Sequence, residues 1–260
     1  MEPVLNINHK RQQFILKWSL IAISCVLLYL LAFNYLIDKR PFVEWTLIKG
    51  GSNEEVPESQ LIKMPDGKVF LINAGDASGS LLPYLKKQKI KDVDLLILTS
   101  TLPKAISGIH GLINTGVRIK EIRTHSFLSQ TTEWENLKTL IQSKSIIDSP
   151  LESEEILYRM GATEFRFISK SKDLVLLKML HGTNKVLLML GDASSLNHEI
   201  SQMNCEDLKV DILLNYLNIN PSIKSSMEQA CSHSYIDLSR EMGTFKILLK
   251  GDSFKWKRGR

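Results

Sequence analysis

The longest apolar run in the chain extends from Trp18 to Ile37 and contains no charged side chain. A helix rises about 1.5 Å per residue, so about 20 residues cover the roughly 30 Å hydrocarbon core of a bilayer. The alternative is a cleavable signal peptide, but its apolar region is usually only about 7 to 15 residues long and ends at an A-x-A site, which is missing here. The pattern therefore predicts an uncleaved single transmembrane helix over residues 18–37, preceded by an N-terminal segment, 1–17.

Basic residues on the two sides of this run indicate its orientation. His9, Lys10, Arg11 and Lys17 precede it, whereas Lys39 and Arg40 follow it. Because cytoplasmic flanks carry the excess of Lys and Arg, we expect a cytoplasmic N-terminus and an extracytoplasmic main domain.

Beyond residue 41, short apolar runs alternate with segments of helical periodicity. Pro65-Asp66-Gly67 separates two of the runs and is typical of a hairpin turn. The first half predicts strands over 43–48, 60–64, 68–73, 94–99 and 119–124, with helices over 80–89, 104–115 and 132–143. The second half predicts strands over 164–169, 174–180, 185–190, 211–215 and 244–250, with helices over 195–203 and 222–231. Two meanders that each lead into βα units predict one α/β domain over 41–250, a two-sheet sandwich with αββα layering.

Composition narrows the class of protein. With 43% apolar and 23% charged residues, the chain is that of a globular protein and wholesale disorder is excluded. Cys25 lies in the apolar run, which leaves Cys205 and Cys231 as two buried thiols or, in an oxidising compartment, a disulfide.

The net charge of +5 is concentrated near the C-terminus. Residues 251–260 form a basic C-terminal tail in which Phe254 and Trp256 are interleaved with Lys255, Lys257 and Arg258. Such a tail either frays in solvent or meets the phosphates of a nucleic acid or an anionic membrane surface.

Four segments of the chain resemble the metallo-β-lactamase fold, and within it the extracytoplasmic domain of ComEC-type DNA-uptake channels. They are Leu61 to Asp76, Leu81 to Ser100, Asp173 to Ile200 and, more weakly, Leu208 to Asn215. The resemblance implies an αββα metallo-β-lactamase-like sandwich, in agreement with the element pattern.

The metal-ligand motif of that family is lost at the matching positions. The family pattern T-H-x-H-x-D-H-x-G-G falls on Thr99 to Gly108, where Ser100, Leu102 and Ala105 replace histidines and Lys104 replaces the aspartate. Leu and Ala side chains offer no lone pair to a metal, and a protonated lysine repels one. At the family's later positions, Leu217 begins the segment that replaces H-H-G-S, and Asn73 replaces the aspartate of D-x-G. Asp192 alone is retained, so we expect no metal cofactor and a pseudoenzyme.

Two residues could preserve part of a site. His233 stands near the family's G-H-P segment, so it is either a residual site residue with Asp192 or an ordinary polar histidine. Asp192 would need a compensating charge once the metal is gone. Either Lys104 pairs with Asp192, or Lys104 points to solvent and Asp192 caps a helix that begins near Ser194.

No other catalytic motif is recognisable, because G-x-S-x-G and the phosphate-binding G-K-[ST] are both missing from the sequence. We therefore expect a non-catalytic, membrane-anchored binding or structural subunit of an envelope-associated complex, with protein partners and no identified small-molecule substrate. One alternative is a metal-dependent hydrolase or nuclease of competence type, with a site remodelled around Asp192 and His233. The other is a non-cleaving DNA-binding module that uses the basic tail.

Overall fold

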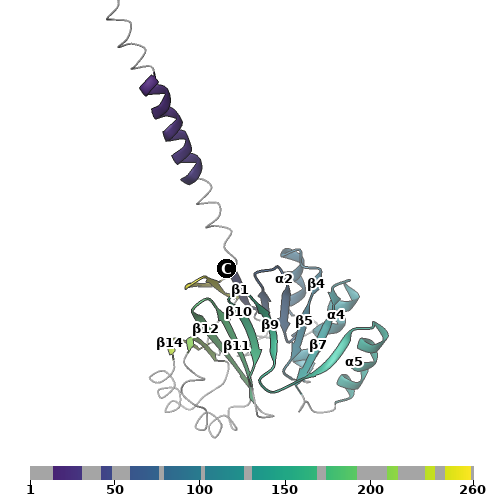
Figure 1. Ribbon diagram of the computed structural model, residues 1–260. Helices are drawn as coiled ribbons and strands as arrows, with labels where there is room; N and C mark the ends of the chain where they lie inside the picture. The colour runs from purple at the N-terminus through teal and green to yellow at the C-terminus, as the bar shows by residue number, and fades with distance from the viewer. Residues whose placement is uncertain are drawn as a thin grey trace, which may run out of the picture. The chain divides into compact units, whose positions relative to one another are not determined.

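The computed structural model describes ten stretches of the chain (Figure 1). They are residues 14–30, 42–48, 59–75, 79–100, 103–125, 131–168, 174–191, 210–215, 232–237 and 244–258. The chain divides into two compact units, Met1–Pro41 and Phe42–Arg260.

The first unit contains a helix over residues 14–30. Its large apolar side chains are exposed, including Trp18 at 58% and Leu28 at 63%. Within the described stretches, no helix has both the length and the apolarity needed to cross a membrane. Residues 31–37 of the predicted transmembrane helix lie outside the described part of the chain.

An eight-stranded sheet forms the centre of the second unit, in the order β16-β15-β1-β2-β3-β5-β7-β8. Its strands are β1 (Phe42–Ile48), β2 (Ser59–Lys63), β3 (Val69–Ile72), β5 (Leu95–Leu98), β7 (Glu121–His125), β8 (Ile147–Leu151), β15 (Phe245–Lys250) and β16 (Ser253–Arg258). Strands β3, β5, β7 and β8 are mutually parallel, and the other neighbours pair antiparallel. A separate two-stranded sheet joins β4 (Asp92–Val93) to β6 (Arg118–Ile119).

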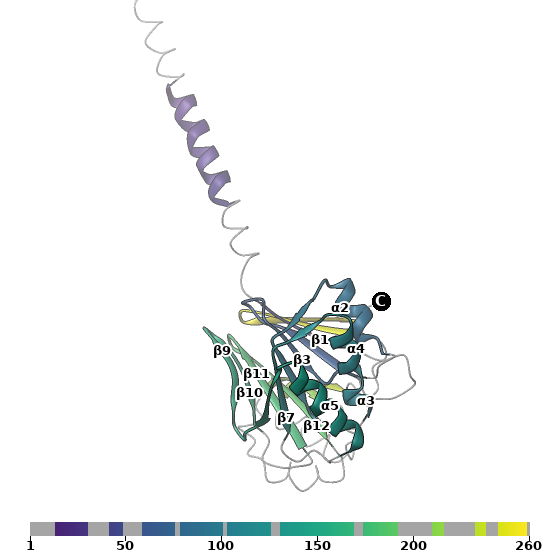
Figure 2. The same ribbon diagram turned by 90° about the vertical axis from the view of Figure 1, so that its right-hand side faces the viewer.

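Helices cover one face of this sheet and a second sheet covers the other (Figure 2). The helices are α2 (Leu81–Lys87), α3 (Pro103–Ile106), α4 (Gly108–Asn114) and α5 (Thr132–Ser143). The second sheet has six strands in the order β14-β13-β12-β11-β10-β9. They are β9 (Ile156–Met160), β10 (Thr163–Phe167), β11 (Leu174–His181), β12 (Asn184–Gly191), β13 (Val210–Asn215) and β14 (Ser232–Asp237).

Alternation of side chains along the strands produces two apolar clusters. One fills the space between the sheets and includes Trp45, Ile97, Phe165 and Leu188, each fully buried. The other lies between the eight-stranded sheet and its helices, with Leu96, Ile109 and Leu137. The continuous apolar run of β5 thus serves both clusters, because successive side chains of a strand point to opposite faces.

Two hairpin turns lock the sheets together at one end of the sandwich. Gly182, in the β11–β12 turn, has φ +60, and a Cβ there would lie 2.6 Å from the Gly251 carbonyl oxygen of the β15–β16 turn. Asn184 donates through Nδ2 to the same carbonyl at 2.6 Å. Thr183 donates through its hydroxyl to Asp252 at 3.2 Å. A glycine is needed at residue 182 because the two turns are in backbone contact.

The structure confirms the mixed α/β architecture and alters several elements. The single helix expected over 104–115 is two helices, α3 and α4. Strands β8, β9 and β14 were not predicted. Of the two alternatives for the basic C-terminus, fraying does not hold for Ser253–Arg258, which pair along their length with β15 as the strand β16. The helices predicted over 195–203 and 222–231 lie outside the described residues.

Candidate functional site at the ends of β3 and β5

The parallel pair β3 and β5 brings Asn73 and Thr99 to the same edge of the eight-stranded sheet. Ile72 is in register with Ile97, so both chains leave the sheet together. Ligands of open α/β sheets bind beyond the carboxyl ends of the strands. The segment from Thr99 to Gly108, which the resemblance matches to the family's ligand motif, begins at this edge.

The Asn73 side chain ties the two strand ends together. Its Oδ1 accepts from the Thr99 backbone N–H at 2.9 Å, and its Nδ2 donates to the Thr99 hydroxyl at 2.8 Å. The Asn73 backbone N–H continues the strand pairing by donating to Ile97 at 2.8 Å. Asn73 has φ 54, in the left-handed region that asparagine tolerates better than most residues. The residue that replaces the family's aspartate therefore shapes the loop as a neutral amide.

Backbone contacts hold the next part of the loop against α3 and α4. The Ala74 N–H donates to the Ala105 carbonyl at 2.8 Å, and the Gly108 N–H donates to the Gly75 carbonyl at 2.9 Å. A Cβ on Gly108 would lie 2.1 Å from the Ala74 carbonyl oxygen. Only glycine fits at this approach, because real Cβ atoms do not come within 3.0 Å of backbone oxygen.

The same contacts explain why the predicted helix is interrupted. Gly108 donates its N–H to Gly75 across the loop instead of to a carbonyl four residues earlier in a continuous helix. The helix consequently restarts at Gly108, with Ser107 as the N-cap residue of α4.

Besides Asn73, two of the predicted former metal-site positions can be described with their side chains. Ala105, which matches a histidine of the family pattern, is 6% exposed and packs in the apolar cluster beneath the helices with Ile106 and Ile109. Ser100 directly follows Thr99 at the strand end and is partly buried. The structure thus brings Asn73, Thr99, Ser100 and Ala105 to one edge of the sheet.

The remaining predicted site residues are not described, in whole or in side chain. Leu102, Asp192 and Leu217 lie outside the described residues. Lys104 belongs to α3 and His233 to β14, but neither side chain is described. The predicted pairing of Lys104 with Asp192, and a residual site of Asp192 with His233, therefore stay predictions. Across the described stretches, no three His, Cys, Asp or Glu side chains are grouped closely enough to hold a metal ion.

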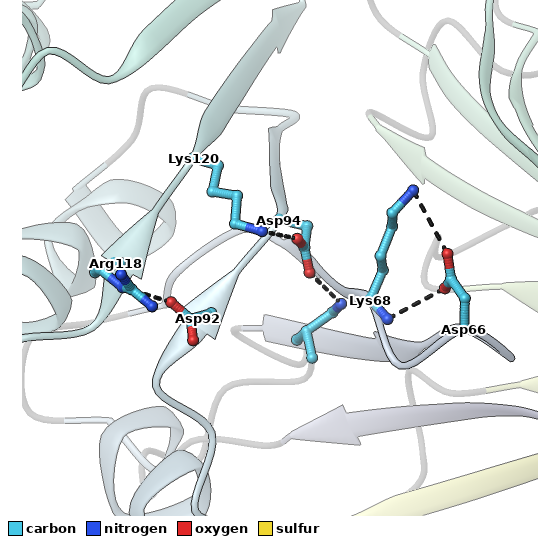
Figure 3. Close-up of polar contacts among 7 residues, drawn as sticks. Asp66, Lys68, Asp92, Asp94, Arg118 and Lys120 are labelled. Atoms are coloured by element: carbon cyan, nitrogen blue, oxygen red, sulfur yellow. Dashed lines mark hydrogen bonds and ion pairs between the residues drawn. The ribbon is translucent and has the colours of Figure 1, made fainter.

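A polar cluster that the sequence analysis missed lies at the opposite ends of the same strands (Figure 3). Lys120 donates to Asp94 Oδ1 at 2.6 Å, and Asp94 Oδ2 accepts from the Val69 N–H at 2.8 Å. Arg118 donates to Asp92 at 2.6 Å. The signal was present in the sequence as Asp92-Val93-Asp94 and Arg118-Ile119-Lys120, whose equal spacing places opposite charges in pairs across adjacent strands.

Charge pairing and hydrogen bonds in this cluster stabilise the ionised form of Asp94. Burial opposes ionisation of Asp94, but its hydrogen bonds from Lys120 and Val69 outweigh burial and lower the pKa of Asp94. The cluster lies at the amino ends of β3 and β5, whereas ligands of such sheets bind at the carboxyl ends. It therefore fixes the starts of strands that end at the candidate site.

A second charged group lies on the helix-bearing face of β1, β2 and β15. Glu44 is 3.0 Å from the Lys246 ammonium and 3.5 Å from that of Lys63. Burial opposes the charged form of Glu44, yet the hydrogen bonds and charges of Lys246 and Lys63 prevail and lower the pKa of Glu44. This one carboxylate links three strands, of which β15 lies far from β1 and β2 in sequence.

Comparisons with known proteins found neither a matching family model nor a matching curated protein. Solved structures do match. A diphosphatase from the PhnP family is 13% identical, with 80% of this chain and 98% of that one covered and a TM-score of 0.46. The metallo-β-lactamase fold protein YhfI from Bacillus subtilis is 13% identical, with 83% of this chain and 100% of that one covered and a TM-score of 0.46. A long form RNase Z from yeast is 11% identical, with 72% of this chain and 35% of that one covered and a TM-score of 0.48.

These neighbours are metallo-β-lactamase-fold proteins and include hydrolases. At such identities the likeness concerns the course of the chain, and it extends neither to the chemistry of the site nor to a ComEC-type relationship.

Proposed function

We propose that this chain is a membrane-anchored pseudoenzyme of the metallo-β-lactamase fold, related to the extracytoplasmic domain of ComEC-type proteins. It serves as a non-catalytic binding or structural subunit of an envelope-associated protein complex.

The observation that carries this proposal is the contrast between the backbone and the side chains of the Thr99 to Gly108 loop. The backbone still requires Gly108 against Ala74, and Asn73 still closes the ends of β3 and β5. At the same loop, the position matched to a ligand histidine is Ala105, whose methyl group is buried among apolar side chains. Alanine cannot coordinate a cation, because its methyl group has no lone pair. A loop with this closed backbone and an alanine at the ligand position is therefore suited to a structural role.

The membrane anchor is supported by the first unit. A helix over residues 14–30 with exposed Trp18, Leu20, Ile23 and Leu27 has no apolar partner among the described residues of its own unit. Exposed apolar surface on this scale needs cover from lipid or protein. The uncharged run from Trp18 to Ile37 is long enough for lipid to supply it.

Membrane extraction and partner capture test the proposal. The full chain, tagged at its C-terminus and produced in its own cell, should stay in the membrane after alkaline carbonate washing. Mild solubilisation should recover the same protein partners, in fixed ratio, with the wild-type chain and with the Asp192→Ala and His233→Ala variants. Release by carbonate contradicts the anchor, and recovery of the chain alone contradicts the subunit role.

The hydrolase alternative makes a different prediction for the same variants. If a remodelled site acts through Asp192 and His233, the solubilised full chain with Zn²⁺ or Mn²⁺ should cleave phosphodiesters, and either alanine variant should abolish the cleavage. We expect the wild-type chain and both variants to be equally inactive.

A further inference from the structure

The strand β16 is an exposed edge of the eight-stranded sheet. It pairs with β15 on one side, and no described strand pairs with its other side. Phe254 packs partly against the core between the sheets, whereas Lys255, Trp256 and Lys257 are exposed, Trp256 at 55%. The open edge therefore presents one largely exposed aromatic ring between two exposed lysines.

The aromatic residues of β16 lie on the face that points toward the second sheet. Phe254 is in register with Leu249 and Trp256 with Ile247, both of which belong to the core between the sheets. The Trp256 ring stacks on Phe245, with centroids 5.4 Å apart and planes at 23°. One face of the indole is thus supported by protein while much of the ring stays open, which suits a side chain that enters a membrane interface.

The lysines of β16 lie on the opposite face and carry unneutralised charge. Lys257 is in register with Lys246, whose ammonium is already paired with Glu44. Glu44 is also paired with Lys63, so its charge is already shared between two lysines. Among the described residues, neither Lys255 nor Lys257 is ion-paired with a carboxylate, and this face therefore attracts anions.

We propose that β16 docks edge-on to an anionic bilayer surface, with Lys255 and Lys257 contacting lipid phosphates and Trp256 entering the interface. This inference rests on the proposed membrane anchor. Lipid is favoured over nucleic acid as the occupant because the aromatic side chains of β16 alternate with only two unpaired lysines, and an aromatic ring beside lysines suits a membrane interface. Each lysine near such a surface strengthens binding roughly fivefold.

Tryptophan quenching in reconstituted vesicles tests the docking. The full chain carries four tryptophans, of which Trp45 and Trp134 are buried. In a Trp18→Phe variant, Trp256 is the exposed tryptophan that remains. The fluorescence lost when Trp256→Phe is added to that variant gives the contribution of Trp256. We expect brominated phosphatidylglycerol to quench Trp256 at least threefold more than brominated phosphatidylcholine. The double variant Lys255→Glu/Lys257→Glu should remove that difference, whereas the matched variant Lys86→Glu/Lys87→Glu, on the exposed side of α2, should keep it.

The outcomes separate the docking from the anchor. A chain that resists alkaline extraction but shows equal Trp256 quenching in both lipids overturns the docking and leaves the anchor intact. A chain released by extraction overturns both. If the β16 charge reversal leaves quenching unchanged and instead abolishes salt-dependent binding of duplex DNA, nucleic acid is the occupant and the lipid proposal is wrong. If the charge-reversed chain misfolds, the comparison with Trp256→Phe still shows whether Trp256 is quenched more by the anionic lipid, because this substitution alters no charge.

Discussion

At the scale of single residues, Gly108 lies too close to backbone to carry a side chain, and the addition of one methyl group tests this. Alanine there would place its Cβ 2.1 Å from the Ala74 carbonyl oxygen, which belongs to backbone and cannot rotate away. We expect Gly108→Ala to lower the free energy of unfolding by about 3 kcal/mol, measured by chemical denaturation of the full chain.

Gly111, in the same helix, provides the matched control. Its added Cβ would lie 2.8 Å from Cδ1 of Leu82, the end of a flexible side chain. Alanine also gains about 1 kcal/mol of helix propensity over glycine, so Gly111→Ala should change stability by less than about 1 kcal/mol. Equal losses in the two variants would show that the Gly108 approach to the loop is not a constraint.

Asp94 links stability to pH. Because its pKa is lowered in the folded state, its contribution is complete above the unfolded value of 3.8 and is lost as pH falls through the folded pKa. Asp94→Asn should therefore cost about 1 to 3 kcal/mol near pH 7, and the difference from wild type should shrink below about pH 4.

The neighbouring pair of Asp92 with Arg118 offers a comparison in which solvent screens the charges. These side chains are 39% and 78% exposed, so Asp92→Asn should cost less than about 1 kcal/mol. A cost for Asp94→Asn that is the same at pH 3 and pH 7 would contradict the role given to its carboxylate.

At the scale of elements, the interlocked turns of β11–β12 and β15–β16 can be tested with a pair of glycines. Gly182 and Gly161 have similar backbone angles, φ +60 and +54, but only at Gly182 would a Cβ meet backbone, 2.6 Å from Gly251. Both alanine variants lose about 1 to 2 kcal/mol of stability, because alanine is strained in the left-handed backbone conformation. We expect Gly182→Ala to cost at least about 1 kcal/mol more in the same denaturation measurement. No difference would mean that the two turns do not close the sandwich.

The sequence predicted those elements whose signals are local. The helix α5 was predicted over the same residues, 132–143, because Thr131 caps it and Glu133 and Glu135 lie in its first turn. The strands β8 and β16 were missed because edge strands bury little. β8 contains Pro150 and has one buried residue, Leu151, while β16 alternates lysine with exposed tryptophan.

The candidate site was predictable only in part. The hypothesis that metal ligands were lost depends on residue type alone, at Ser100, Leu102, Lys104 and Ala105, so the sequence suffices to state it. The break between α3 and α4 could not be predicted from the sequence. It arises from hydrogen bonds with Ala74 and Gly75, about thirty residues earlier in the chain. The ties between Asn73 and Thr99 are equally long-range, and no local periodicity encodes them.

At the scale of the whole molecule, two sheets pack face to face around an apolar cluster, and helices cover the other face of the larger sheet. Trp45 and Phe165 meet edge to face between the sheets, 6.1 Å apart, and the helices bury the other face of the larger sheet. Both clusters consist of apolar side chains, which offer no ligands to a metal ion. The fold should therefore unfold at the same temperature with and without a chelator.

The metal content of the purified full chain tests the central claim most directly. The chain would be equilibrated with excess Zn²⁺ or Mn²⁺, freed of loosely held ions by gel filtration, and measured by elemental analysis beside Asp192→Ala. We predict well under 0.1 ion per chain for both proteins, a rough threshold for adventitious metal given that a site needs three or more protein ligands. One tightly held ion per wild-type chain, absent from Asp192→Ala, would contradict the account.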